Sequence, residues 1–354
     1  MPENTQSTAA GPDAPAPALA VQTPGPGAAW GVALAMTAFA WWGAVFPLYL
    51  TKLNELVGRP TSASFNYGIE VVAHRVIWAC LLCLGVLAVQ RKLGRVVALV
   101  TNPKSLAVMA ASGLLIGINW LAFVFAVSQD RLSEASLGYY ICPLFSVLLG
   151  VVAFRERLSP LQTLSILIAA IGVGIEWYST GSVPIIALSV SISFALYGMI
   201  RKRAKAGPLD GLAVEAGLIG PLALAFVLWK AFGPATTETV TDASGIEPSA
   251  APYTLQFGTT WAITVMFLIS GFMTALPLTL FAASTKRLRL STLGFLQFSG
   301  PTIQFAVSVL IFKEAAATTP TRLLVFTLIW IGVGLFIADA LITSRKTAKA
   351  QRSP

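Results

Sequence analysis

Three ionisable side chains lie close together inside a long apolar run of the sequence. Glu70, His74 and Arg75 fall near the start of a predicted membrane span, 69–89, and Glu70 and His74, four residues apart, share one helical face. Ionisable groups inside a span are costly and usually face a cavity. The pattern therefore indicates an anion-binding site at Arg75, with His74, the only histidine, as a proton-sensitive partner. Alternatively, Glu70 and Arg75 lie at headgroup level and reach into water.

Other polar groups lie deeper in the apolar runs. Glu215, about one turn into the predicted span 211–232, is a candidate cavity acid or a helix-start carboxylate favoured by the macrodipole. Glu70, His74 and Glu215 are the candidates for coupling and gating. The substrate-binding candidates besides His74 and Arg75 are Asn119, Trp120, Tyr139, Tyr140, Gln297 and Gln304. Aromatic rings with a few amides suit an apolar to zwitterionic metabolite, although each group could instead join one helix to another.

The composition identifies the class of protein that must position these groups. The chain has 354 residues, of which 56% are hydrophobic and only 11% charged, too few to cover a soluble core, so we expect a polytopic membrane protein. The net charge of +9 comes from short basic clusters between apolar runs, which fits membrane orientation better than nucleic-acid binding. Cys80, Cys83 and Cys142 all lie in apolar runs, so neither a metal site, a cofactor nor a disulfide framework is expected.

Hydropathy predicts an all-α integral membrane protein with ten transmembrane helices. The predicted spans are 30–50, 69–89, 105–126, 134–154, 161–179, 183–200, 211–232, 259–283, 291–312 and 321–342. Residues 1–28 resemble a disordered tail, and 343–354 a basic cytoplasmic tail. With both termini cytoplasmic, seventeen Lys and Arg lie in inside segments and six in outside segments, which places the loop 233–258 outside. Under this topology, His74 and Arg75 are the only basic residues within a span.

The chain contains an internal repeat. The stretch 126–156 recurs as 282–314, with matching Leu-Gly pairs, matching prolines and a Phe-Arg-Glu ending that recurs as Phe-Lys-Glu. Further matches extend the repeat to five spans, 30–179, followed by five more, 183–342. Because five is odd, the second repeat enters the membrane from the opposite side, which predicts two inverted repeats and favours an alternating-access transporter.

Each repeated stretch carries a proline near the middle of its span. Pro143 and Pro301 each remove a helix hydrogen bond, freeing the carbonyls of Tyr139 and Gln297. An unpaired carbonyl at this depth is tolerated only against protein or a water-filled cavity. We therefore expect both spans to kink and to line a polar space.

At this point the sequence resembles the EamA-type branch of the drug/metabolite transporter superfamily. The marks are Glu156, Gly172, Gly174, Glu314 and Gly332. More narrowly, the strings HRVIW, NWLAF, EASLGYY, GSVPIIAL and RLRLSTLGF are similar to the RarD group, often called chloramphenicol-sensitive proteins. The resemblance runs from about Trp30 to Arg345. It implies a ten-helix permease of the bacterial inner membrane and no particular substrate.

These observations lead to an expected function with two alternatives. We expect a non-enzymatic carrier of a small organic metabolite or drug, with export or exchange coupled to the proton gradient. The expected partners are a small-molecule substrate, membrane lipid and an optional second copy in a homodimer, with no nucleic acid. A polytopic membrane enzyme and a channel or sensor without carrier activity are the alternatives. An enzyme would need clustered catalytic groups, which the sequence pattern does not suggest.

Overall fold

The computed structural model describes residues 27–58, 65–128, 132–180, 185–234, 237–240, 249–313 and 319–352. The disordered tail expected at 1–28 lies outside this part of the chain, except for its last two residues.

Within these ranges, ten helical segments are long and apolar enough to cross a membrane, which confirms the ten predicted spans. The first is built from three joined pieces and the ninth from two. In order, the elements are α1 (Ala28–Ala40), η1 (Trp41–Val45) with α2 (Phe46–Val57), α3 (Phe65–Val89), α5 (Pro103–Ser128), α6 (Leu132–Phe154), α7 (Pro160–Thr180), α8 (Ile185–Arg203), α9 (Pro208–Phe232), α10 (Trp261–Thr285), α11 (Leu290–Gln297) with α12 (Ser299–Leu310), and α13 (Pro320–Arg352). Helix α13 continues through most of the predicted basic tail.

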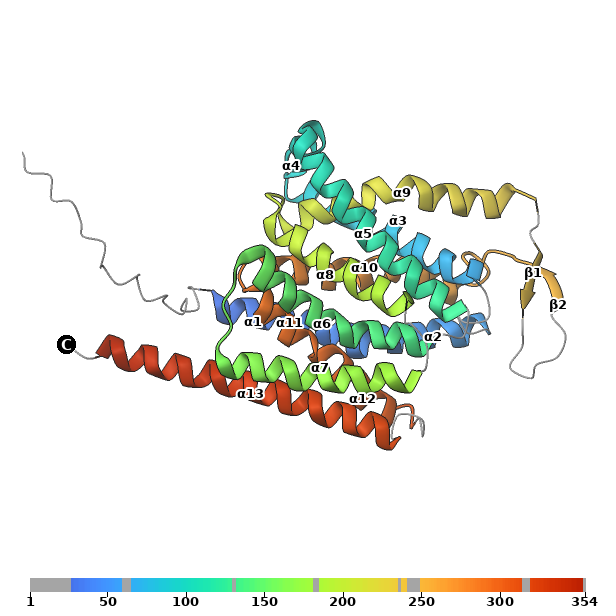
Figure 1. The fold of residues 1–354 in the computed structure, drawn as a ribbon. Coiled ribbons are helices and arrows are strands. Elements are labelled where there is room, and N and C mark those ends of the chain that lie inside the picture. The colour runs from blue at the N-terminus through green and yellow to red at the C-terminus, as the bar shows by residue number, and fades with distance from the viewer. Residues whose placement is uncertain are drawn as a thin grey trace, which may run out of the picture.

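A short helix and a two-stranded hairpin lie outside the spans. Helix α4 (Leu93–Thr101) joins α3 to α5, and strands β1 (Thr237–Val240) and β2 (Ser249–Pro252) form an antiparallel hairpin. The hairpin falls in the loop predicted at 233–258 and is the one departure from an all-α fold among the described residues. Figure 1 shows it at one end of the bundle, while the start of α1 and the end of α13 lie at the other.

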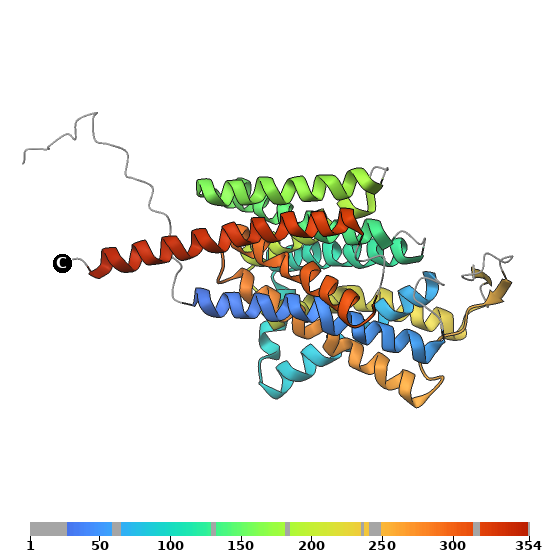
Figure 2. The same cartoon turned by 90° about the horizontal axis from the view of Figure 1, so that it is seen from below.

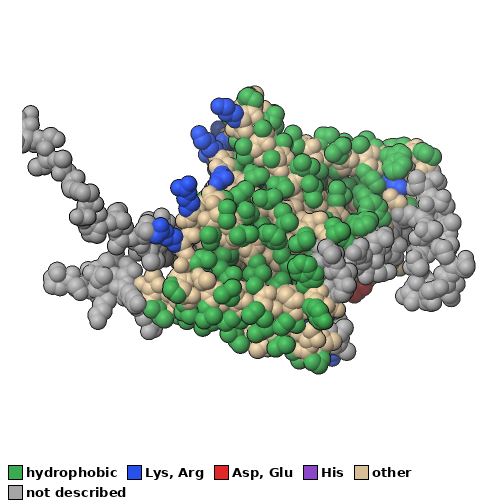
Figure 3. Space-filling model, viewed as in Figure 1, with side chains coloured by type: hydrophobic (Ala, Val, Ile, Leu, Met, Phe, Trp, Pro, Cys, Tyr) green, Lys and Arg blue, Asp and Glu red, His purple; other side chains and the backbone are tan. Residues whose placement is uncertain are grey.

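The spans pack into one bundle with an apolar outer surface. Helix α13 packs on α7, α3 packs on α9 and α10, and α6 packs on α8 and α11; the spans run along a common direction (Figure 2). On the face seen in Figure 3, hydrophobic side chains cover the middle of the bundle, and Lys and Arg gather near the end where α1 starts and α13 ends. This is the surface expected of a bundle surrounded by lipid.

Two spans are irregular at the level of the cavity described below. In the first span, η1 is a π-helical turn, a feature often found at functional sites. In the ninth, α11 ends at Gln297 and α12 begins at Ser299, two residues before Pro301. By contrast, α6 continues unbroken through Pro143. The two prolines therefore have different effects on helix continuity, although their sequence settings match.

A glycine brings these two irregular spans together. A Cβ atom at Gly43, in η1, would lie 2.6 Å from the carbonyl oxygen of Gly300, in α12. Since real Cβ contacts are never so short, only glycine permits this approach. The π-helical turn is thereby held against the broken ninth span, beside Pro301.

Candidate functional site: a central cavity with one unpaired arginine

A cavity of about 500 Å³ lies among the spans. Its walls come from the first span and from α3, α5, α6, α8, α10, α11 and α12. Of the predicted binding residues, it is lined by Arg75, Asn119, Trp120, Tyr139, Gln297 and Gln304, and also by Pro301. It extends to Asn54, within one turn of the end of α2, which lies towards the hairpin end of the bundle (Figure 1). The sequence thus identified most of the polar lining.

Arg75 is the charged residue of this lining, and α3 turns it inward together with Val72, three residues earlier. Its Nε donates to the Thr274 hydroxyl at 2.9 Å, and that hydroxyl donates to the Ser270 carbonyl at 3.0 Å. Its guanidinium carbon lies 4.6 Å from the centre of the Phe46 ring and 5.3 Å from that of Trp120. Arg75 is 9% exposed, so aromatic faces rather than water surround its charge.

Three side-chain amides of the lining differ in their hydrogen bonds. The Asn119 Nδ2 donates to the Val190 carbonyl at 2.8 Å, which ties α5 to α8. The Gln297 Oε1 accepts from the Ser146 hydroxyl at 2.8 Å, which ties α11 to α6. Gln304 is exposed and makes no hydrogen bond within the described part of the chain. Asn119 and Gln297 therefore join helices while facing the cavity, and Gln304 offers a free amide.

The cavity ends at an aromatic floor, the cluster formed by Phe39, Trp42, Phe194, Tyr197 and Phe281. Neighbouring ring centres are 5.0 to 6.1 Å apart, and Phe281 is fully buried. Beyond the floor, the Tyr197 hydroxyl donates to Glu215 Oε2 at 3.3 Å. The floor thus separates the cavity from Glu215.

Glu215 is buried in an ion pair. Its Oε1 lies 3.4 Å from Arg201 Nη1, with both side chains 1% exposed, and it also accepts from the Ser112 hydroxyl. Arg201 Nη2 donates to the carbonyls of Gly207 at 3.2 Å and Pro208 at 2.8 Å. The expectation that His74 and Arg75 are the only basic residues within a span is wrong, because α8 continues beyond residue 200 and buries Arg201.

Glu70 and His74 face away from the cavity. Successive helix residues differ by about 100°, so His74 points elsewhere than Arg75. Glu70, fully buried, accepts from the backbone N–H of Gln256 and of Phe257, each at 2.9 Å, and from the Tyr253 hydroxyl. This carboxylate fastens the segment after the hairpin to α3.

His74 packs beside that segment. Its ring lies 4.5 Å from the Phe257 ring, and its Nδ1 accepts from the Trp78 indole at 3.1 Å. Its Nε2 has no hydrogen-bond partner within the described part of the chain and lies 4.0 Å from a Glu70 oxygen. The structure therefore separates His74 from Arg75, which the sequence grouped into one site.

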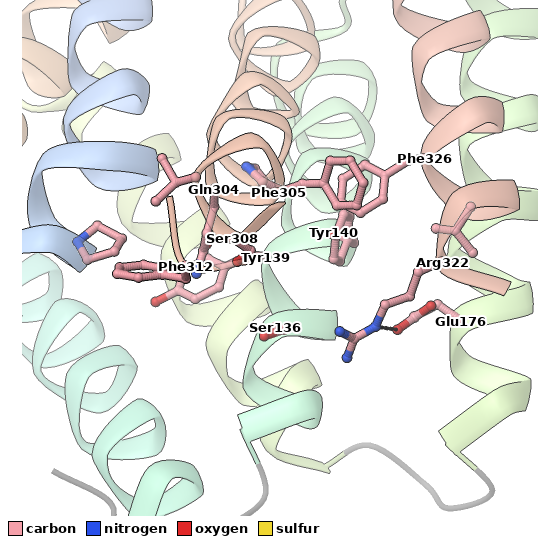
Figure 4. Close-up of a pocket in the computed structure, with 14 residues that line it drawn as sticks. Ser136, Tyr139, Tyr140, Glu176, Gln304, Phe305, Ser308, Phe312, Arg322 and Phe326 are labelled. Carbon is pink, nitrogen blue, oxygen red and sulfur yellow. Dashed lines mark ion pairs between the residues drawn. The ribbon is translucent and has the colours of Figure 1, made fainter. Parts of the chain in front are cut away.

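A second cavity of about 340 Å³ adjoins the first and shares Pro47, Tyr139, Pro301 and Gln304 with it. Tyr140 lines this side cavity rather than the central one. Figure 4 shows the pair of Glu176, from α7, and Arg322, from α13, on its far wall, 4.0 Å apart.

Sequence reasoning did not select the Glu176–Arg322 pair, Thr274 or Arg201. The charged pair had one usable signal, since the repeat makes the fifth and tenth spans equivalent in sequence, and these two residues lie near the end of the fifth span and the start of the tenth. Thr274 had none, because threonine is common in spans and its role depends on packing of α10 against α3.

Comparison with known proteins identifies first the class and then the family. A crystal structure of a protein 16% identical to this chain matches it with a TM-score of 0.60, over 89% of this chain and 99% of its own. This likeness shows that the two chains share a fold, which in the described part of this chain has ten helical segments able to cross a membrane. No family model matches the chain.

Sequence relatives are closer. "Protein RarD" of Salmonella typhimurium is 35% identical over 89% of this chain and 97% of its own length, and that of Escherichia coli is 33% identical over 90% and 97%. An "Uncharacterized transporter" of Vibrio cholerae is 32% identical over 91% and 96%. The chain belongs to the RarD family of membrane transporters, as the sequence motifs indicated.

Proposed function

We propose that the chain is a secondary transporter that moves a small organic metabolite or drug across the bacterial inner membrane by alternating access. The observation that carries the proposal is the central cavity, which has a mixed aromatic and amide lining and a closed aromatic floor. A carrier needs such a site, reachable from one side while the other side is sealed.

Helix contacts support the division into two inverted repeats, 30–179 and 183–342. When each span of a packed pair is replaced by the span five places away in the sequence, the resulting two spans are also packed together. Helices α5 and α8 pack together, as do α10 and α1; α6 packs on α8 as α11 packs on α1; and α7 packs on its own partner, α13. A bundle with this internal symmetry can reach an opposite-facing state when its halves exchange conformations.

We propose that both termini are cytoplasmic and that the hairpin is outside. The Lys and Arg gathered near the terminal end support this orientation (Figure 3). The structure would then represent an outward-facing state, since the cavity extends towards the hairpin end. A cysteine introduced at Ser244, between β1 and β2 in the sequence, should react with an impermeant reagent on intact cells. Reaction only after lysis would reverse the assignment.

Transport is proposed to be export or exchange coupled to the proton gradient. Glu70, His74 and Glu215 are the candidates for proton exchange, and all three lie outside the lining of the central cavity. Coupling would therefore act on helix packing rather than by direct contact with the substrate. The Glu215–Arg201 pair is suited to this, since it lies directly beyond the floor that must open.

The test is substrate counterflow in proteoliposomes. An uptake screen with and without a pH gradient selects the substrates, and counterflow with preloaded vesicles then measures exchange. We expect saturable exchange, reduced by Trp120→Ala and unchanged by Tyr178→Phe, a control on the lipid-facing side of α7 where the side chain is 90% exposed. Non-saturating flux would identify a channel, and chemical conversion of the substrate an enzyme.

A further inference from the structure

Arg75 has unused hydrogen-bonding capacity directed at the central cavity. A guanidinium carries five N–H donors and stays charged in proteins. Only one donor, Nε, has a partner among the described residues, the Thr274 hydroxyl. Because that hydroxyl is itself oriented by the Ser270 carbonyl, the guanidinium is held in place with its terminal nitrogens free.

The charge of Arg75 also lacks a counter-charge. No carboxylate of the described chain lies within ion-pair distance of it, and its titratable neighbours are the phenols of Tyr49 and Tyr139. Elsewhere the spans do pair a buried arginine with a carboxylate, as Arg201 with Glu215 shows. A cation that is nine-tenths buried and unpaired is costly, and the rings of Phe46 and Trp120 compensate only in part. A bound anion would remove this cost.

The surroundings restrict what that anion can be. One cation balances a single negative charge, whereas a phosphate monoester carries nearly two near neutral pH. No acidic side chain lines the described walls of the central cavity, so an ammonium group would find no counter-charge there. The remaining lining is mainly aromatic and aliphatic, including Trp42, Phe123 and Leu278, and matches an apolar body.

We infer that the central cavity takes an amphipathic monocarboxylate, an organic acid with an aromatic or aliphatic body, whose carboxylate is bound by the terminal nitrogens of Arg75. This inference rests on the proposed function, because it names the substrate class of the same cavity. The planar fork of Arg75 fits a carboxylate through two parallel hydrogen bonds. Trp120 and Phe46 would flank the ion pair and keep water from it.

The test measures binding rather than transport, with the full chain in lipid nanodiscs. Isothermal titration at neutral pH compares 3-phenylpropionate, its uncharged amide 3-phenylpropionamide and the amine 3-phenylpropan-1-amine. We expect the carboxylate to bind about 10- to 100-fold more tightly than the amide, the range for a charge-assisted hydrogen bond, and the amine more weakly still. Since only the parent protein is needed, this comparison does not depend on a variant that folds.

Two variants locate the effect. Arg75→Gln should abolish the preference for carboxylate over amide, and Arg75→Lys should retain part of it because the charge stays while the fork is lost. Arg203→Gln is the matched control, since Arg203 is exposed at the end of α8, where its guanidinium lies 4.7 Å from the Phe154 ring outside the cavity lining. Its preference should equal that of the parent.

Equal affinities for carboxylate and amide, a preference for the amine, no binding of the carboxylate, or a preference that survives Arg75→Gln would each overturn the inference. The outcome is separable from that of the proposed function. Carboxylate-selective binding without flux would leave the ligand assignment standing and refute the carrier. Saturable counterflow of a substrate, together with binding that does not favour the carboxylate, would support the carrier and refute the ligand assignment.

Discussion

Arg75 and Arg201 are both buried within the spans, with 9% and 1% exposure, yet their surroundings are opposite. Arg201 has a carboxylate and two backbone carbonyls as partners. Arg75 has one hydroxyl and two aromatic faces. A buried charge with its counter-charge present joins helices, whereas one without it has interaction energy left for a ligand.

The two arginines also lie on opposite sides of the aromatic floor. Arg75 faces the cavity above it, and Arg201 lies beyond it, connected through Glu215 and Tyr197. In the proposed cycle, the floor opens when packing around the Glu215–Arg201 pair changes. Substrate binding at Arg75 and separation of the floor residues beside the Glu215–Arg201 pair would then be the first and last events of one conformational change. We call these two regions the Arg75 end and the Arg201 end. Each variant below alters one of these ends.

The largest effect is expected from Glu215→Gln. It leaves Arg201 charged and buried without its counter-charge, which destabilises a protein by about 3–5 kcal/mol. We expect a large fall in the thermal unfolding temperature in detergent. The control is Glu55→Gln, which breaks the exposed pair with Lys52, where the side chains are 58% and 62% exposed and the contact contributes little. Equal falls in the unfolding temperature of the two variants would mean that the buried pair does not stabilise the fold.

A double variant that removes both charges sharpens this test. Replacing both partners, as Arg201→Met with Glu215→Leu, removes the uncompensated charge and should recover most of the stability. Counterflow should nevertheless stay impaired if the pair governs the floor. Recovery of both stability and exchange would restrict the pair to a structural role.

The next effect concerns the space that Arg201 occupies. Residue 211 is glycine, and a Cβ there would overlap the Arg201 guanidinium, so Gly211→Ala should destabilise the protein by about 1–3 kcal/mol. Gly174→Ala is the control, because no atom lies within 4 Å of the added Cβ in α7. Unfolding of both variants by heat would check the difference. Similar unfolding temperatures would show that Arg201 can move aside.

The sequence predicted the architecture well because the bilayer imposes it. Span length and basic loops are properties of single segments and the repeat can be read by aligning the chain with itself, and the ten spans follow from these signals. Arg75 could also be predicted as a site residue, since an arginine within an apolar run is itself a signal. Its partner Thr274 could not, because that contact joins residues 199 positions apart.

The Arg201 end was misjudged for a physical reason. Arg201 begins a run of three basic residues, a pattern that indicates a cytoplasmic loop. The helix continues through the run and turns Arg201 inward, onto Glu215, because Gly211 leaves it room. Glu70 and His74 share a helical face, as expected. The backbone segment that this face contacts, Gln256–Phe257, could not be predicted, because nothing in its sequence indicates that it packs on α3.

A smaller effect is expected on the Arg75 side. Thr274→Val removes the hydroxyl that fixes Arg75 and should weaken apparent substrate affinity about fivefold, corresponding to roughly 1 kcal/mol, with the maximal rate retained. Thr279→Val, in the same helix, is the matched control, because the Thr279 hydroxyl is buried without a hydrogen-bond partner in the described chain. Concentration dependence of counterflow measures both. An affinity loss shared by the control would point to a general change in α10.

The smallest expected effect concerns His74, which lies next to Arg75 in α3 but faces away from the cavity. His74 Nδ1 accepts from Trp78, so the neutral ring carries its proton on Nε2, which faces Glu70 at 4.0 Å and has no other polar partner among the described residues. Protonation would occur on Nδ1, which could then no longer accept from Trp78, and would place a cation between Glu70 and the Phe257 ring. It would thus exchange a contact within α3 for attraction to the Glu70 carboxylate that holds the segment after the hairpin. His74→Gln should therefore flatten the pH dependence of counterflow between about pH 5.5 and 8.5 while changing the maximal rate little. A profile that superimposes on that of the parent would remove His74 from proton coupling and leave Glu70 and Glu215 as the remaining candidates.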